Sequence, residues 1–147
     1  MSERVTVRTL ALADYDRWME LWQTAGLHSV RPLGRDSREA FARQLASGAH
    51  TMIGLEVEGT LAGVVLATHD GRKGWINRLA VLPAYRRRGF AARLVAEAED
   101  VLHAEGILVI AALIEPENEA SLGLFRKLGY EEARGLHYVR KKDSQEA

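Results

Sequence analysis

The sequence predicts a mixed α/β fold in which helices cover one central sheet. Stretches with alternating apolar residues are interleaved with stretches in which apolar residues recur every three or four positions. Their order is strand, two helices, three strands, helix, strand, helix and strand, which implies a single sheet with helices packed against it. The length of 147 residues, 47% of them hydrophobic and 27% charged, suits one domain over residues 1–147, with residues 141–147 as a charged, frayed tail.

The N-terminal part of the chain predicts one strand and two helices. Val5 and Val7 alternate with polar residues, as in a strand with one buried face. A helical apolar face follows over residues 14–26 and ends at a glycine. Residues 36–39, Asp-Ser-Arg-Glu, resemble a capping box, so we expect the second helix to begin at Asp36 and to end near residue 48.

The middle of the chain predicts a hairpin followed by a strand and a long helix. Residues 51–57 and 61–68 are rich in strand formers, and Glu58-Gly59 between them supplies the turn. A polar loop leads to a third strand over residues 75–81. The helix after it runs to Gly106.

The C-terminal part predicts a strand, a helix and a last strand. Residues 107–114 are apolar without interruption, which is typical of a strand buried on both faces. Asn118 can cap a helix that ends at Gly129. Residues 130–140 can then supply the final strand.

Composition excludes several classes of function. Lys plus Arg and Asp plus Glu both number 20, so no overall charge attracts the protein to nucleic acid or to a membrane surface. The chain has no cysteine for a disulfide, a thiol nucleophile or a thiolate site, and its five histidines lack metal-ligand spacing. Its beginning lacks the apolar core of a signal peptide. We therefore expect no metal and a cytoplasmic location.

A basic loop, RRRGFA, joins the third strand of this middle region to the long helix. A helix start leaves backbone N–H groups unpaired and carries a partial positive charge, so it can bind phosphate. Gly89 removes a side chain where a ligand would approach the backbone, while Arg86, Arg87 and Arg88 add full charges. An ordinary crossover with solvated arginines is the alternative. Because three like charges at a helix N-terminus oppose its dipole, the pattern favours the anion site.

Two ordered motifs in this sequence resemble those of the Gcn5-related N-acetyltransferase (GNAT) superfamily. The first is Leu79-Ala80-Val81 followed by Arg86-x-x-Gly89-x-Ala91, which is similar to motif A of the family. The second runs from Asn118 to Gly129-Tyr130. The likeness is greatest to small bacterial enzymes of the ribosomal-protein-alanine acetyltransferase type. It implies the acyl-CoA N-acyltransferase fold, with a splayed, mostly antiparallel sheet flanked by helices.

The resemblance also implies a co-substrate, acetyl-CoA. In this family the motif A loop holds the pyrophosphate, and the preceding strand pairs with the pantetheine arm inside the splay. The residues that the resemblance assigns to acetyl-CoA are Leu79, Ala80, Val81, Arg86, Arg87, Arg88, Gly89, Phe90, Ala91, Ala92, Asn118, Ser121 and Phe125. Capping a helix would by itself also account for Asn118.

The resemblance leaves the catalytic groups open. Acetyl transfer needs a neutral amine, a polarised thioester carbonyl and a stabilised thiolate. By position, the backbone N–H of Val81 or its neighbour would polarise the carbonyl. Phe125 stands where the family usually has a tyrosine acid, and Leu113 stands where the ribosomal-protein-alanine type has a glutamate base.

Glu115 is the candidate base. In a strand it would share a face with Leu113, near the mouth of the splay, and could act directly or through water. A carboxylate that merely terminates a strand is the alternative. Together with Glu117 and Glu119 it could instead attract a cationic amine.

The sequence thus predicts an acetyl-CoA-dependent N-acetyltransferase that transfers acetyl to a primary amine by direct attack. The acceptor, a small molecule or a protein N-terminus or lysine, is not identified by any motif. Leu113 and Phe125 favour an alternative, a non-catalytic acyl-CoA-binding or regulatory module, which turnover would distinguish. A homodimer is common in the family, although the composition does not require one.

Overall fold

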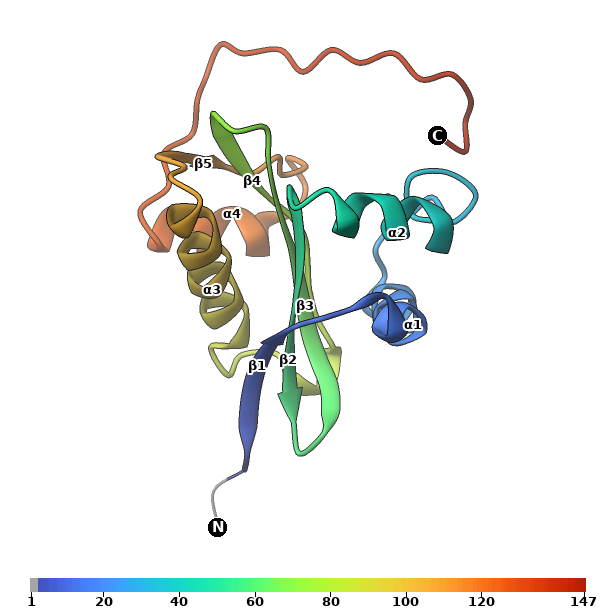
Figure 1. Ribbon diagram of the computed structural model, residues 1–147. Coiled ribbons are helices and arrows are strands. Elements are labelled where there is room, and N and C mark those ends of the chain that lie inside the picture. Colours follow the sequence, from blue (N-terminus) through green and yellow to red (C-terminus); the bar gives the residue numbers. More distant parts are fainter. Residues whose placement is uncertain (1–2) are drawn as a thin grey trace.

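Five strands form one sheet in the order β1-β2-β3-β4-β5, with helices on both faces (Figure 1). The computed structural model describes residues 3–147. The elements are β1 (Val5–Thr9), a 3-10 turn (Leu12–Asp14), α1 (Tyr15–Ala25), α2 (Arg38–Ala46), β2 (His50–Val57), β3 (Thr60–His69), β4 (Lys73–Val81), a second 3-10 turn (Pro83–Tyr85), α3 (Phe90–Ala104), β5 (Val109–Ala111) and α4 (Glu119–Lys127). Strands β1 to β4 are antiparallel and β5 is parallel to β4, which confirms the predicted mixed α/β class.

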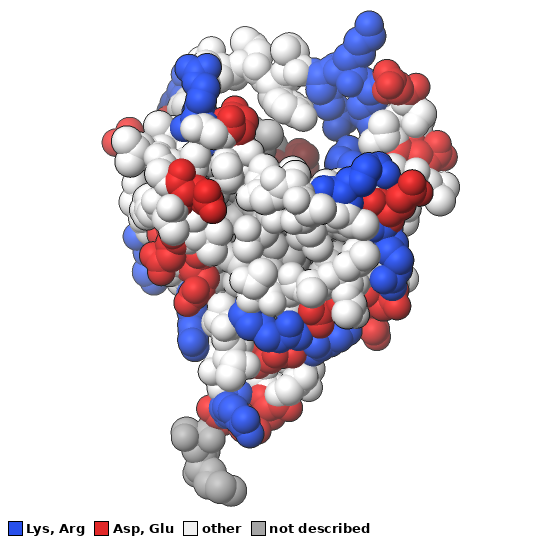
Figure 2. Space-filling view, in the orientation of Figure 1, with Lys and Arg blue, Asp and Glu red and all other residues white. Residues whose placement is uncertain are grey.

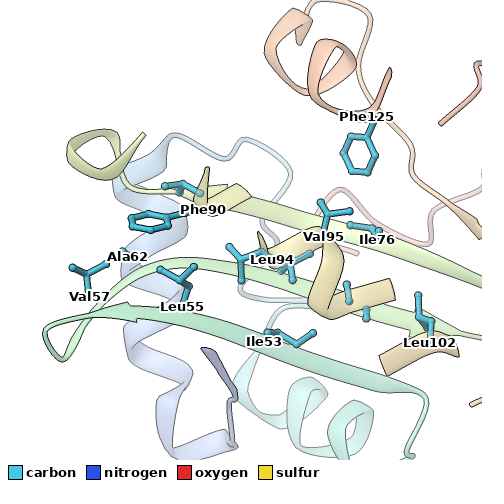
Figure 3. Packing of buried hydrophobic residues seen from close by; sticks show 14 of the residues in the cluster. Ile53, Leu55, Val57, Ala62, Ile76, Phe90, Leu94, Val95, Leu102 and Phe125 are labelled. Carbon is cyan, nitrogen blue, oxygen red and sulfur yellow. The ribbon is translucent and has the colours of Figure 1, made fainter. Parts of the chain in front are cut away.

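The sheet separates two hydrophobic clusters. On one face, α3 packs Leu94, Val95 and Leu102 against residues of the strands that include Leu55 and Ile76 (Figure 3). On the other face, α1 and α2 bury an aromatic group made of Tyr15, Trp18, Trp22 and Phe41. Burying one such large side chain contributes about 1.5–3 kcal/mol, so each helical layer is held to the sheet by its own apolar contacts.

Strands β4 and β5 separate after a short paired stretch. The parallel register joins Lys73 to Val109, Gly74 to Ile110 and Trp75 to Ala111. No further pair joins these two strands within residues 3–147, so β4 from residue 76 onward has no strand on that side. This opening is the splay that the sequence predicts next to the basic loop.

Strand β5 is shorter and more exposed than the sequence predicts. The apolar run 107–114 was expected to be buried on both faces, but only Val109–Ala111 form a strand. Leu108 is 89% exposed and Leu113 is 63% exposed, whereas Ile107 is buried. The reason is that β5 is the outermost strand: Ile110, Ala112 and Ile114 pack against the cluster under α3, and no strand of the described chain pairs with the outer edge.

The last predicted strand, residues 130–140, does not form. After α4 the chain leaves the body as an extended arm that crosses to the side of α2 (Figure 1), and it spans a hollow in the molecular surface (Figure 2). Residues 131–140 are all exposed, and no strand of the described chain pairs with them. Alternating apolar residues do not make a strand without a partner edge. At the end of the arm, Arg35 Nη1 donates to the backbone oxygen of Ala147 at 2.8 Å.

The second helix begins one residue later than the capping-box pattern predicts. Ser37 is the cap, and its Oγ accepts from the N–H of Ala40 at 3.0 Å. Asp36 is instead 3% exposed and turns inward. Its Oδ2 accepts from the N–H of Arg31 at 2.7 Å and from Arg78 Nη2 at 2.9 Å. A tertiary ion pair therefore displaces the local cap.

None of the helices within residues 3–147 combines the length and the apolar character needed to cross a bilayer.

Candidate active site

The basic loop ends at the N-terminus of α3 as predicted. Gly89 is the residue before the helix and has a φ of 81°, in the left-handed region that favours glycine. The first hydrogen bond of the helix runs from the N–H of Arg93 to the oxygen of Gly89 at 3.1 Å, so the N–H groups of Phe90, Ala91 and Ala92 lie ahead of it. A Cβ added at Gly89 would have no atom within 4 Å. The first backbone N–H groups of α3 therefore lie beside open space at Gly89.

The three arginines of the loop have different surroundings. Arg86 Nε donates to the oxygen of Val81 at 3.0 Å and its Nη2 donates to that of Ala25 at 3.4 Å, so this side chain ties the loop to β4 and to the end of α1. Arg88 pairs with Glu3 and lies 4.9 Å over the ring of Phe90. Arg87 has a φ of 64°, and its side chain makes no hydrogen bond within residues 3–147. The sequence did not indicate the structural contacts of Arg86 and Arg88.

A β-bulge interrupts β4 beside the splay. The register pairs Leu66 with Asn77 and Val64 with Ala80, so Arg78 and Leu79 together oppose a single residue of β3. Arg78 has a φ of 55°, which is uncommon for a residue with a side chain. Bulges of this kind rotate the following backbone and frequently border active sites. Leu79 in the bulge, and Ala80 and Val81 after it, lie on the stretch that β5 does not pair.

Helix α4 presents two predicted site residues near its start and buries a third. Asn118 Oδ1 accepts from the N–H of Ser121 at 3.2 Å, so the asparagine acts as a cap. Phe125 is 6% exposed and points toward Val95 and Ile76 in the core (Figure 3). Phe125, which the resemblance assigns to acetyl-CoA, thus has its ring in the core.

Tyr130 is engaged by contacts within the chain. Its ring packs edge-on against Phe125 with centroids 4.9 Å apart, and its hydroxyl donates to Glu99 Oε2 on α3 at 2.6 Å. Burial, followed by the hydrogen bond to Glu99, raises the pKa of Tyr130 well above its usual value. A phenol so engaged is a poor proton donor.

Glu115 lies in the loop after β5 and is exposed. Its backbone oxygen accepts from the N–H of Asn118 at 3.0 Å, which forms the turn into α4. The argument that Glu115 and Leu113 share a strand face is wrong, because the strand ends at Ala111. If the Glu115 carboxylate acts in catalysis, it does so from a loop and not from a strand.

A second candidate site, a cavity of about 360 Å³ on the α2 side of the sheet, was not visible in the sequence. The loop before α2, helix α2 and strands β2, β3 and β4 supply the lining residues, which are Arg35, Asp36, Gln44, His50, Leu66, Thr68, Asn77 and Arg78. Burial lowers the pKa of Arg78, opposed by the neighbouring Asp36 carboxylate. Burial, with the nearby His69, also lowers the pKa of His50 and so favours its neutral form. Asp36 and Arg78 are 42 residues apart, so no local motif could have shown their pairing.

Comparison with known proteins places this geometry in a family. The model of the acetyltransferase (GNAT) family matches residues 15–130. An acetyltransferase of Yersinia pestis (strain Pestoides F) is 32% identical over 125 residues, which cover 85% of this chain and 86% of that protein.

Solved structures share the fold at lower identity. The aminoglycoside N-acetyltransferase AAC(6')-Iy in complex with CoA has a TM-score of 0.78 at 21% identity and covers 97% of both chains. The ribosomal-protein-S18-alanine N-acetyltransferase of Escherichia coli has a TM-score of 0.73 at 22% identity, over 88% of this chain and 79% of that one.

A splayed sheet with an open helix N-terminus beside it, together with these matches, defines an acyltransferase of the acyl-CoA N-acyltransferase fold. The chain belongs to the acetyltransferase (GNAT) family and is an N-acetyltransferase, which confirms the resemblance seen in its sequence.

Proposed function

We propose that this N-acetyltransferase uses acetyl-CoA and transfers the acetyl group to a primary amine by direct attack. The observation that carries the proposal is the placement of the open N-terminus of α3 directly beyond the unpaired stretch of β4. The first can bind a pyrophosphate and the second can pair with an extended amide-containing arm. One bound molecule would use both.

Each proposed contact follows from this placement. The backbone N–H groups of Gly89, Phe90, Ala91 and Ala92 would bind the pyrophosphate, assisted by the charge of Arg87. The Arg86 and Arg88 side chains would chiefly hold the loop in shape, because both are already engaged within the chain. Leu79, Ala80 and Val81 would offer backbone groups to the pantetheine, and Asn118 and Ser121 would border it from α4.

The chemistry supplied by the co-substrate is one acyl exchange: a C–N bond forms as the C–S bond breaks, CoA leaves as the thiolate, and the amine loses a proton. We assign the backbone N–H at Val81 or its neighbour to the carbonyl oxygen. We assign Glu115 to the amine proton, acting through water from its loop. We assign no general acid to the CoA sulfur, since the Phe125 side chain has no acidic proton to donate and the Tyr130 hydroxyl is hydrogen-bonded to Glu99. A thiolate with a pKa of about 8.5 can leave unprotonated.

Calorimetric titration with acetyl-CoA and with CoA tests the proposal first. We expect saturable binding of both ligands, because the pyrophosphate and pantetheine are common to them. Turnover on a panel of amines then separates an active enzyme from a binding module. If neither ligand bound, the assignment of the loop and splay would be wrong.

We also propose that the protein forms a homodimer by exchange of the arm. Leu108 and Leu113, on either side of β5, are exposed, and the arm exposes Leu136, Tyr138 and Val139 at 77%, 68% and 85%. An unpaired strand edge and an unpaired extended segment both leave backbone groups without hydrogen-bond partners. The arm can supply the partners that the edge of β5 needs, and the edge can supply those that the arm needs. The arm of its own chain leads away from β5 (Figure 1), so a second copy is the natural partner.

Sedimentation of the full chain at micromolar concentration tests the dimer. We expect Val139→Glu to shift the protein toward monomer, since it places a charge in the new sheet, whereas Lys141→Glu beyond the segment should not. A wild-type chain that stays monomeric at high concentration would refute the exchange.

A further inference from the structure

The cavity beside Arg78 has a chemical character that acetyl transfer by itself does not require. Seven of its eight lining residues are polar, and Leu66 is the exception. Pockets for drug-like ligands are mostly apolar, and a volume of about 360 Å³ lies at the small end of their range. The cavity therefore suits a small molecule that carries at least one polar or charged group.

Arg78 supplies hydrogen-bond donors that the protein does not use. Its Nη2 donates to Asp36 Oδ2 at 2.9 Å and to the oxygen of Ser29 at 3.1 Å. Its Nη1 is buried and has no partner within residues 3–147. A buried guanidinium nitrogen without an acceptor is costly, and a carboxylate oxygen can satisfy Nη1 with a charge-assisted hydrogen bond.

The charges around the cavity also favour an anion. Asp36 is already occupied by Arg78 and by the N–H of Arg31. Arg35, the second arginine of the lining, donates to the backbone oxygen atoms of Ala147 and Ser29. The lining thus carries two guanidinium groups and one carboxylate. Positive surroundings also disfavour an ammonium group, so they help to keep an acceptor amine neutral for attack.

The cavity adjoins the proposed site of transfer. Asn77 and Arg78 both line it, and both lie on β4 after Trp75, the last residue paired with β5. The backbone of Arg78 forms the bulge beside the splay while its side chain forms the cavity wall. A ligand held by the side chain would therefore sit next to the stretch of β4 assigned to the thioester.

We infer that the acceptor is a small amine that carries a carboxylate, as an amino acid does, and that Arg78 and Arg35 hold the carboxylate. The inference rests on the proposed function, because it assigns the cavity to the acceptor. Membership of the family does not determine the acceptor, and this inference assigns it to a chemical class.

Matched acceptors test the inference directly. Amino acids are compared with their carboxamides, which keep the side chain and the amine but lack the negative charge. We expect kcat/KM for the acid to exceed that for the amide by roughly tenfold or more, as a hydrogen bond to a charged group predicts. Equal or better turnover of amides would overturn the inference while leaving the proposed function intact.

The sharpest variant is Arg78→Lys. Lysine keeps a positive charge for Asp36 but loses the second nitrogen of the fork. We expect it to lower the acid-to-amide preference roughly tenfold, because turnover of the acid falls more than turnover of the amide. Arg35→Gln, at an exposed position, gives the same test if the buried variant fails to fold. Arg72→Gln, exposed and outside the cavity, should change neither rate.

A binding measurement separates the two hypotheses. N-acetylglycine and N-acetylglycinamide are titrated into the protein with CoA present, and we expect heat from the acid only. If CoA binds and the acid does not, the carboxylate site is wrong. If CoA does not bind, the proposed function fails, and selective binding of the acid would still support the carboxylate site.

Discussion

Substituting alanine for Gly89 tests the phosphate-binding loop, and the structure predicts the magnitude of the effect. The added Cβ meets no atom within 4 Å, so no steric clash arises. The remaining cost is the left-handed backbone at a φ of 81°, about 1–2 kcal/mol for a residue with a side chain. The Cβ would occupy the space in which the pyrophosphate is proposed to lie. Losing one charge-assisted hydrogen bond there costs about 1.5–3 kcal/mol, or roughly 10- to 150-fold in affinity.

Gly106→Ala is the matched control for this substitution. Gly106 follows the other end of α3, has a φ of 80° and likewise has no atom within 4 Å of an added Cβ. Both variants should lose similar stability in urea denaturation, while only Gly89→Ala should lose affinity for acetyl-CoA and CoA in calorimetry. Equal affinities for the two variants would refute the placement of the pyrophosphate.

Three further predictions concern titratable groups. Hydrogen bonding from Arg8, opposed by burial, lowers the pKa of Asp14 from 3.8 to about 2, so the ionised form stabilises the fold. That contribution to the free energy of unfolding is complete above pH 4 and is lost as the pH falls toward 2. Asp14→Asn should therefore lower the free energy of unfolding by about 1–2 kcal/mol at pH 7 in urea denaturation, and should make stability depend less on pH in the acid range. Tyr130→Phe should lower the thermal midpoint slightly, by the loss of its bond to Glu99, without changing kcat; a large fall in kcat would make the phenol the acid. Glu115→Gln should lower the rate and shift its pH profile, whereas Glu117→Gln should not, and identical profiles would remove Glu115 from the mechanism.

The fold class and the loop before α3 could be predicted from the sequence because local patterns determine them. The alternation in the hairpin, the apolar face of α3 and the left-handed glycine before it depend on residues close together in the chain. The paired aromatic residues of α1 likewise follow from helical spacing. Such features need no knowledge of distant segments.

The failures share a different physical cause, which is dependence on a partner far away in the chain. Residues 130–140 alternate like a strand, but a strand exists only where another edge accepts its hydrogen bonds. Asp36 has the residue type of a helix cap, but the more deeply buried contact with Arg78 takes its carboxylate. The cavity forms where that contact and residues of the neighbouring strands β2, β3 and β4 come together, so no local sequence motif predicts it.

The two apolar clusters on opposite faces of the sheet imply that the two sides of the active site can change independently. One cluster, through α3, fixes the loop assigned to acetyl-CoA; the other, through α1 and α2, fixes the cavity assigned to the acceptor. Mutations at separated sites with no common contacts generally add in their effects. Substitutions at Arg35, Gln44 or His50, which line the cavity outside α3 and its loop, can therefore change the acceptor side while the donor side keeps its sequence.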